Sequence, residues 1–103
     1  MLDLTEEGFN EFILAETKPV LIDFWAPWCG PCRAIAPKLE ALELKRQDIL
    51  FCKVNADQQM NLAKSLGVSG IPTLVLFLNG EEISRTVGMP SAGLEDFLDK
   101  NLQ

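Results

Sequence analysis

The sequence predicts an α/β protein with a three-layer α/β/α fold, in which helices cover both faces of a central mixed five-stranded sheet. Strand-forming apolar runs alternate with segments of helical spacing in the order βαβαβαββα. Residues 20–25 are apolar on both faces, which indicates a central strand covered on both sides. Two helical crossovers imply parallel strands, and Asn79-Gly80 predicts a hairpin that makes the last two strands antiparallel. At 103 residues the chain fits one domain, which we expect to span 1–103.

The first predicted elements are a short strand, a helix and the central strand. Residues 2–4 provide only a very short strand. Thr5 is a suitable N-cap for a helix with two glutamates in its first turn, and Pro19 marks the end of that segment. Residues 20–25 then supply the β-branched, aromatic and aliphatic side chains that favour a buried strand.

A second helix is expected over about 31–46. It has a proline in its first turn, where a backbone N–H would lack a partner in any case. Ile35, Leu39 and Leu42 recur at helical spacing and predict its buried face. A second proline, Pro37, lies inside the helix and is expected to kink it, because the carbonyl one turn earlier loses its donor.

The second half of the chain continues the alternation of strands and helices. Gly67 can end a short helix, and Leu94, Phe97 and Leu98 recur at helical spacing near the C-terminus. The expected elements are a strand at 49–54, a helix capped by Asp57, strands at 73–78 and 83–87, and a final helix capped by Ser91.

Composition excludes several classes of function. Nine basic and fifteen acidic residues give a formal net charge of -6, which disfavours binding to the phosphate backbone of nucleic acids. No apolar run approaches the ~20 residues that span a bilayer. The first residues lack the basic and apolar regions of a signal peptide, so we expect a cytoplasmic protein that does not bind membranes.

The three cysteines and the absence of histidine exclude further kinds of catalytic and metal site. Without histidine there is no Cys-His or Ser-His-Asp catalytic arrangement and no His-containing zinc site. Cys29 and Cys32 form a Cys-x-x-Cys pair, which zinc ribbons and redox sites share. The second pair that zinc would need is missing, so no metal is expected. Cys52 lies in a strand and is interpreted as a small core residue, the alternative being a regulatory thiol.

The Cys-x-x-Cys pair is predicted to lie where a strand ends and a helix begins. A thiol there lies beside unpaired N–H groups and the positive end of the helix dipole, and both favour the thiolate. Cys32 follows Cys29 on the same helical face, close enough to form a disulfide with it. This placement predicts thiol–disulfide exchange, in which Cys29 attacks a target disulfide and Cys32 resolves the mixed disulfide. The alternative is two free thiols beside a turn.

Asp23 is an acidic residue in an otherwise apolar strand. Burial should raise the pKa of its carboxyl group, because desolvation disfavours the charged form. Such a group can accept, near neutral pH, the proton that Cys32 loses when it attacks the mixed disulfide. The pattern leaves a second interpretation equally open, in which Asp23 is structural and caps backbone donors or pairs with Lys53 on the neighbouring strand.

The run from Val20 to Cys32 resembles the thioredoxin family, and the resemblance extends over essentially the whole chain. It implies the thioredoxin fold and a monomeric, general protein-disulfide reductase that cycles between dithiol and disulfide. Its implied partners are oxidised protein substrates and a thioredoxin reductase, and no cofactor is implied because the cysteine pair is the redox centre. The further matches are Pro37, Lys53-Val54-Asn55, Gly70-Ile71-Pro72-Thr73, Phe77, Asn79-Gly80 and Val87-Gly88.

The resemblance also implies roles for single residues. Cys29 matches the attacking cysteine and Cys32 the resolving one. Asp23 matches the acid that deprotonates Cys32, and Lys53 matches the lysine that modulates this acid. Gly30 and Pro31 match the dipeptide that keeps the redox couple of the two cysteines reducing. The surface that docks target proteins, called the docking rim, matches Trp28, Gly70, Ile71, Pro72 (in cis), Gly88 and Met89.

Three features depart from the family pattern, and two rival functions remain open. The N-terminal strand is short, Met89 stands where a small residue is common, and the chain has no tyrosine. A flexible thioether at Met89 is expected to alter target preference. One rival is a disulfide-forming oxidase or isomerase, against which the Gly-Pro dipeptide argues. The other is a binding subunit that uses the docking rim without turnover.

Overall fold

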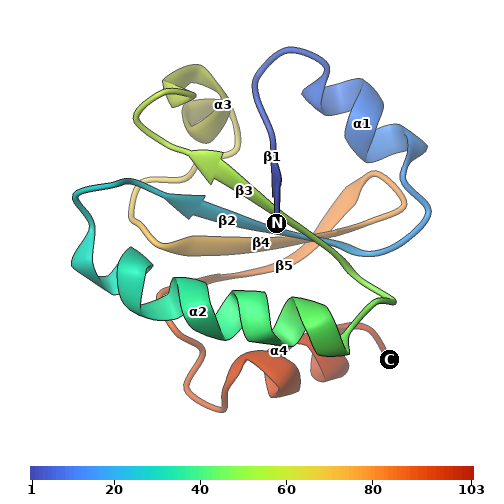
Figure 1. Cartoon of the computed structure of the whole chain (residues 1–103). Coiled ribbons are helices and arrows are strands. Elements are labelled where there is room, and N and C mark those ends of the chain that lie inside the picture. Colours follow the sequence, from blue (N-terminus) through green and yellow to red (C-terminus); the bar gives the residue numbers. More distant parts are fainter.

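The computed structural model describes all 103 residues and has the predicted element order βαβαβαββα (Figure 1). None of its helices has the length and apolar character needed to cross a membrane. The strands are β1 (Leu2–Asp3), β2 (Val20–Trp25), β3 (Leu50–Asn55), β4 (Thr73–Leu78) and β5 (Glu81–Val87), and the helices are α1 (Phe9–Ala15), α2 (Gly30–Lys45), α3 (Met60–Ser65) and α4 (Leu94–Asn101).

The five strands form one mixed sheet in the order β1-β3-β2-β4-β5, which confirms the predicted sheet. β3 runs parallel to both β1 and β2, whereas β4 runs antiparallel to β2 and to β5. Because β4 is reversed, its first residue, Thr73, pairs with Phe24 near the end of β2. The segment that precedes β4 therefore lies beside the loop that follows β2.

Helices cover both faces of the sheet, α1 and α3 on one side and α2 and α4 on the other (Figure 1). Alternate side chains of β2 point to opposite faces, so Val20, Ile22 and Phe24 join the core under α1 and α3. Leu21 joins the core under α2 and α4. Asp23 shares the face of Leu21 by the same alternation, which directs its carboxyl group toward the α2 side.

The tight hairpin between β4 and β5 is confirmed at Asn79-Gly80. Both residues have positive φ, 53° and 82°, as a two-residue turn that matches the strand twist requires. A side chain at Gly80 would also require the exposed tip of Leu14 to shift, since an added Cβ would lie 2.8 Å from its Cδ2. The predicted inner faces of α2 and α4 are likewise buried. α2 runs unbroken through Pro37, and the kink there stays a prediction.

The predicted side-chain caps of three helices are wrong. α1 begins four residues after Thr5, behind Gly8 in a left-handed conformation, and α4 begins behind Gly93. α3 begins three residues after Asp57, and none of the three helices has a side-chain cap. The physical reason is that turns precede these helices and displace Thr5, Asp57 and Ser91 from the first turn.

Candidate active site

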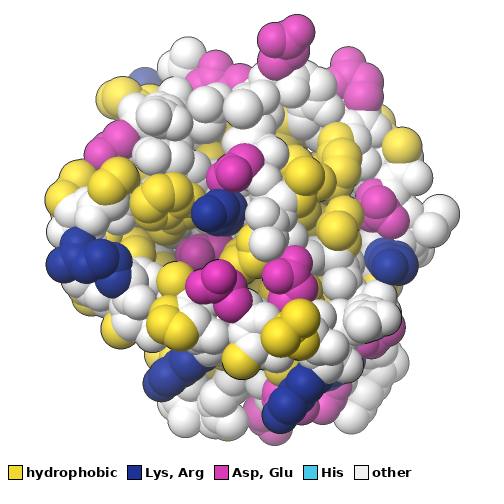
Figure 2. Space-filling view, viewed as in Figure 1, with side chains coloured by type: hydrophobic (Ala, Val, Ile, Leu, Met, Phe, Trp, Pro, Cys, Tyr) yellow, Lys and Arg dark blue, Asp and Glu magenta, His cyan; other side chains and the backbone are white.

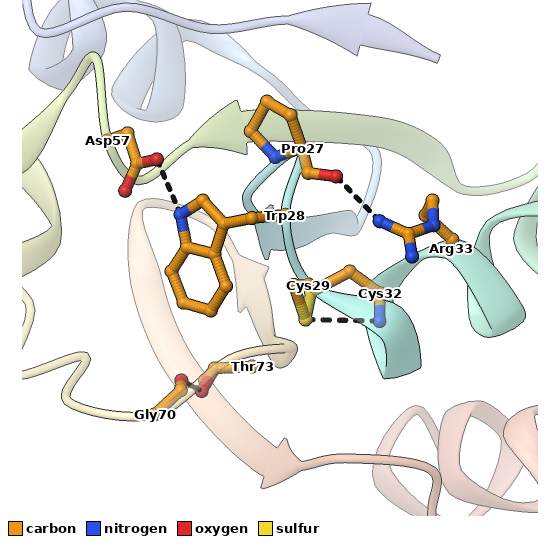
Figure 3. The surroundings of a disulfide bond; sticks show 8 residues. All are labelled: Pro27, Trp28, Cys29, Cys32, Arg33, Asp57, Gly70 and Thr73. Atoms are coloured by element: carbon orange, nitrogen blue, oxygen red, sulfur yellow. Dashed lines mark hydrogen bonds between the residues drawn. A yellow bond between two sulfur atoms is a disulfide. The ribbon is translucent and has the colours of Figure 1, made fainter.

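The Cys29–Cys32 disulfide joins the end of the turn after β2 to the first turn of α2, with the two Cα atoms 5.2 Å apart (Figure 3). Cys29 is the N-cap residue of α2 and has extended backbone angles. The backbone N–H of Cys32 donates to Sγ of Cys29 at a distance of 3.2 Å. The structure thus confirms the predicted pairing and directs an amide donor at the sulfur of Cys29.

Both cysteines are almost fully buried, with 4% of Cys29 and 2% of Cys32 exposed. They pack with Ala26, and Trp25 and Ile71 lie against this small cluster. Little of either cysteine is therefore accessible from outside the protein.

Hydrogen bonds fix the loop that carries Trp28. The Arg33 guanidinium donates to the carbonyl of Pro27 at 2.8 Å, and the backbone N–H of Cys29 donates to Ala26 at 3.1 Å. The indole N–H of Trp28 donates to Oδ2 of Asp57 at 2.7 Å (Figure 3). Trp28 is nevertheless 67% exposed, so a large apolar surface is held in place beside the disulfide. Sequence reasoning missed this bond because it assigned Asp57 to a helix cap.

The segment before β4 forms the other side of the site. The Ile71–Pro72 peptide bond is cis, as the resemblance implies. The backbone N–H of Gly88 donates to the carbonyl of Pro72 at 2.7 Å, and the Thr73 hydroxyl donates to the carbonyl of Gly70. These bonds bring Gly70, Ile71 and Pro72 together with the end of β5, where the exposed Met89 follows Gly88.

Asp23 lines a cavity of about 190 Å³ that Cys32 also lines. Its side chain is 4% exposed, and Oδ1 is buried without a hydrogen-bond partner. A cavity of this size, into which the carboxyl group of Asp23 projects among partly apolar neighbours, has room for water molecules. The cavity therefore places the carboxyl group of Asp23 and the side chain of Cys32 on one shared space. Its other lining residues are Met1, Trp25, Arg33, Ala36, Glu40 and Lys53.

Burial raises the pKa of Asp23 from 3.8 to about 6, and the positive charge of Lys53 partly opposes this rise. The two residues are paired neighbours on β2 and β3. The ion pair of Lys53 is formed with Asp3 at 3.9 Å, and its Nζ also lies 5.5 Å from the ring centre of Trp25. Asp23 thus neither caps a backbone donor through Oδ1 nor forms the close ion pair of the structural interpretation.

Cys52 is fully buried in the core on the other face of the sheet. Burial raises the pKa of its thiol to about 12, so the reactive thiolate is suppressed. This confirms the interpretation of Cys52 as a core residue and leaves the Cys29–Cys32 pair as the redox centre.

Comparisons with known proteins match this chain to thioredoxins over nearly its whole length. The sequence model of the thioredoxin family matches residues 1–100. Thioredoxin 1 of Synechococcus elongatus is 40% identical over 101 residues, which cover 96% of this chain and 94% of the relative. The thioredoxin of Chlamydia caviae is 49% identical over 86 residues, covering 84% and 82% of the two chains.

The fold and the disulfide also indicate a thioredoxin. The X-ray structure of Fasciola hepatica thioredoxin superposes with a TM-score of 0.90 at 34% identity, covering 98% of this chain and 99% of the other. In this chain, the cysteines of the Cys-x-x-Cys motif are bonded at the start of a helix, as thiol–disulfide exchange requires. The chain therefore belongs to the thioredoxin family of protein-disulfide reductases.

Proposed function

We propose that Cys29 is the attacking cysteine and Cys32 the resolving one. In the reduced protein the thiolate of Cys29 attacks one sulfur of a target disulfide, and the other target sulfur leaves as a thiolate. The sulfur of Cys32 then attacks Cys29, releases the reduced target and closes the Cys29–Cys32 disulfide, so that two electrons pass to the target. The N-cap position of Cys29 and the amide donor from Cys32 support this order, because both stabilise negative charge on Cys29.

We propose that Asp23 accepts the proton of Cys32 during the second attack. The observation that carries this proposal is the cavity that both residues line. With a pKa of about 6, the carboxyl group of Asp23 is largely ionised at neutral pH and can take up a proton. Lys53 modulates this group, because its charge lowers the pKa that burial raises.

We propose that target proteins dock on the exposed surface around the disulfide. Burial of both cysteines supports this, since the target must contact the neighbouring surface before its disulfide can react. Gly30 and Pro31 between the cysteines are proposed to keep the couple reducing. The proposed docking residues are Trp28, Gly70, Ile71, Pro72, Gly88 and Met89.

The proposed partners are oxidised proteins and a thioredoxin reductase that restores the dithiol. We propose that residues 1–103 act as one monomeric domain without a bound cofactor. The cytoplasm is proposed as its location, because a reducing compartment keeps such a dithiol reduced between turnovers.

The test is to trap the intermediate with single cysteine variants. Cys32→Ser should accumulate a mixed disulfide with a protein substrate such as insulin, because no second sulfur is present to resolve it. Cys29→Ser should form none and should lose insulin reduction. Cys52→Ala is the matched control, since it removes the remaining cysteine from the core and should leave trapping by Cys32→Ser intact. Trapping through Cys32 instead of Cys29 would reverse the proposed roles.

A further inference from the structure

Arg85, on β5, binds the end of α3 rather than solvent. Its Nη2 donates to the carbonyl of Leu66 at 2.6 Å, and its Nη1 donates to the carbonyl of Gly67 at 3.3 Å. These carbonyls belong to the last turn after α3, where no further helical N–H is available to satisfy them. Arg85 thus supplies a positive charge and two donors at the negative end of a helix.

Glu82 holds the guanidinium of Arg85 in this orientation. Nε of Arg85 donates to Oε2 of Glu82 at 2.6 Å, and Nη2 donates to Oε1 at 2.7 Å. This two-pronged contact fixes both the plane and the direction of the guanidinium group. The side chains of both residues are about one-third exposed, so this pair lies at the surface and its role rests on the fixed geometry of the contact.

The residues that Arg85 binds begin the loop that leads to Pro72. The N–H groups of Gly67 and Val68 bond back to carbonyls of α3, so the start of the loop moves with that helix. The end of the loop is held by the bond from Gly88 to Pro72. The segment 66–72 is therefore attached to β5 at one end and to Gly88, the residue after β5, at the other, and Arg85 makes the only side-chain hydrogen bonds between this segment and β5.

We propose that Arg85, held by Glu82, is a positioning residue that keeps the loop 66–72 in the shape that docks protein substrates. The inference rests on the proposed docking role of Ile71 and Pro72. A loop that is ordered before binding loses less conformational entropy when the target docks. Loss of the Arg85 contacts should therefore weaken docking and leave the exchange between sulfurs, which takes place at Cys29, largely unchanged.

The test compares Arg85→Ala with Arg46→Ala on two substrates. Arg46 is a matched control because it also bonds two side chains, Asp48 and Asp99, but does not contact the loop. The KM of Arg85→Ala for insulin is expected to rise about fivefold to tenfold, with kcat changed by at most about twofold. Reduction of a small aromatic disulfide, which needs no docking surface, should change by at most about twofold. Arg46→Ala should leave both substrates unaffected.

Two further variants and one measurement distinguish an effect on the loop 66–72 from a loss of overall stability. Arg85→Lys keeps the charge but loses the fork, so its KM should lie between those of the wild type and Arg85→Ala. Glu82→Gln should raise KM in the same direction. Amide hydrogen exchange at 67–70 should accelerate in Arg85→Ala while the exchange of β2 and β4 is retained.

The outcomes separate this inference from the proposed function. Unchanged exchange at 67–70 in Arg85→Ala, or a KM for insulin that rises equally in Arg85→Ala and Arg46→Ala, would overturn the positioning role. An equal loss on insulin and on the small disulfide would also overturn it, because it would indicate general destabilisation. If faster exchange at 67–70 left the KM for insulin unchanged, the loop would be loosened without effect, and the proposed docking role of Ile71 and Pro72 would fail instead.

Discussion

Asp23 shows how one buried carboxyl group links stability to reactivity. Its pKa rises from 3.8 to about 6 because the folded site disfavours the charged form. The folded protein therefore binds a proton at Asp23 more tightly than the unfolded chain does. The stability that this proton contributes is complete below about pH 4 and is lost as the pH rises through about 6.

We predict that Asp23→Asn stabilises the protein at neutral pH. The difference between 3.8 and about 6 corresponds to about 3 kcal/mol that the charged wild-type side chain costs above pH 6. The gain in the free energy of unfolding should approach this value at pH 7.5 and vanish near pH 3.5. Urea unfolding of the oxidised wild type and variant across this range measures it. A gain that is the same at every pH would show that the charge of Asp23 is not its source.

Removal of Lys53 should move the pH dependence of the resolving step. The positive charge of Lys53 lowers the pKa of Asp23, so Lys53→Gln should raise that pKa above about 6. The rate at which Cys32 resolves the mixed disulfide should then reach its plateau at a higher pH. Stopped-flow measurement of resolution against pH follows the shift. Lys38→Gln, an exposed lysine of α2, is the control and should leave the midpoint unchanged.

Single residues were predictable where local chemistry determines their place. Cys29, at the junction of a strand and a helix, and Asp23, in an apolar strand, stand out without any knowledge of neighbours. The bond from Trp28 to Asp57 joins residues 29 positions apart, and the contacts of Arg85 with Leu66 join residues 19 apart. No local pattern encodes such pairs, because they depend on how the fold places the loop after β2 beside the loop after β3, and β5 beside the end of α3.

At the scale of elements, α2 combines a buried face with the reactive N-terminus. The helix packs Ile35, Leu39 and Leu42 against the sheet and so fixes where Cys29 and Cys32 lie relative to Asp23. Its packing is therefore a condition of the site's geometry as well as of stability.

We predict that Leu39→Ala and Leu44→Ala, on the same helix, differ sharply in stability. Leu39 is 0% exposed and Leu44 is 79% exposed. Leu39→Ala should lower the free energy of unfolding by about 3 kcal/mol, since it leaves a cavity between α2 and the sheet. Leu44→Ala should change it by less than about 0.5 kcal/mol. Guanidinium unfolding of the oxidised proteins measures both, and similar losses would mean that exposure does not determine the cost.

Element types were predictable because the hydrophobic period differs between strands and helices, and because Asn79-Gly80 specifies its turn. Helix starts were not predictable, because turn residues separate the suitable side chains of Thr5, Asp57 and Ser91 from the first residue of each helix. The reversed direction of β4 against β2 is also a tertiary property, because the short α3 connection does not itself determine the pairing.

At the scale of the whole molecule, the sheet order brings three distant segments to one edge. Because β2 lies between β3 and the reversed β4, the loop with Trp28 meets Asp57 on one side and Pro72 on the other. The site is therefore assembled from segments that lie 29 and 44 residues after Trp28 in the sequence, which only the topology places together.

The net charge of -6 should make target reduction depend on the charge of the target. Acidic side chains are spread over the face that Figure 2 shows, so the field around the molecule attracts basic proteins and repels acidic ones. Raising the ionic strength from about 0.01 M to about 0.15 M shortens the Debye length from about 30 Å to about 8 Å. The value of kcat/KM should then fall for a basic disulfide protein and rise for an acidic one, while a small neutral disulfide should respond little. Stopped-flow reduction of the three substrates across this range measures the effect, and the same salt response for all three would show that steering by net charge plays no part.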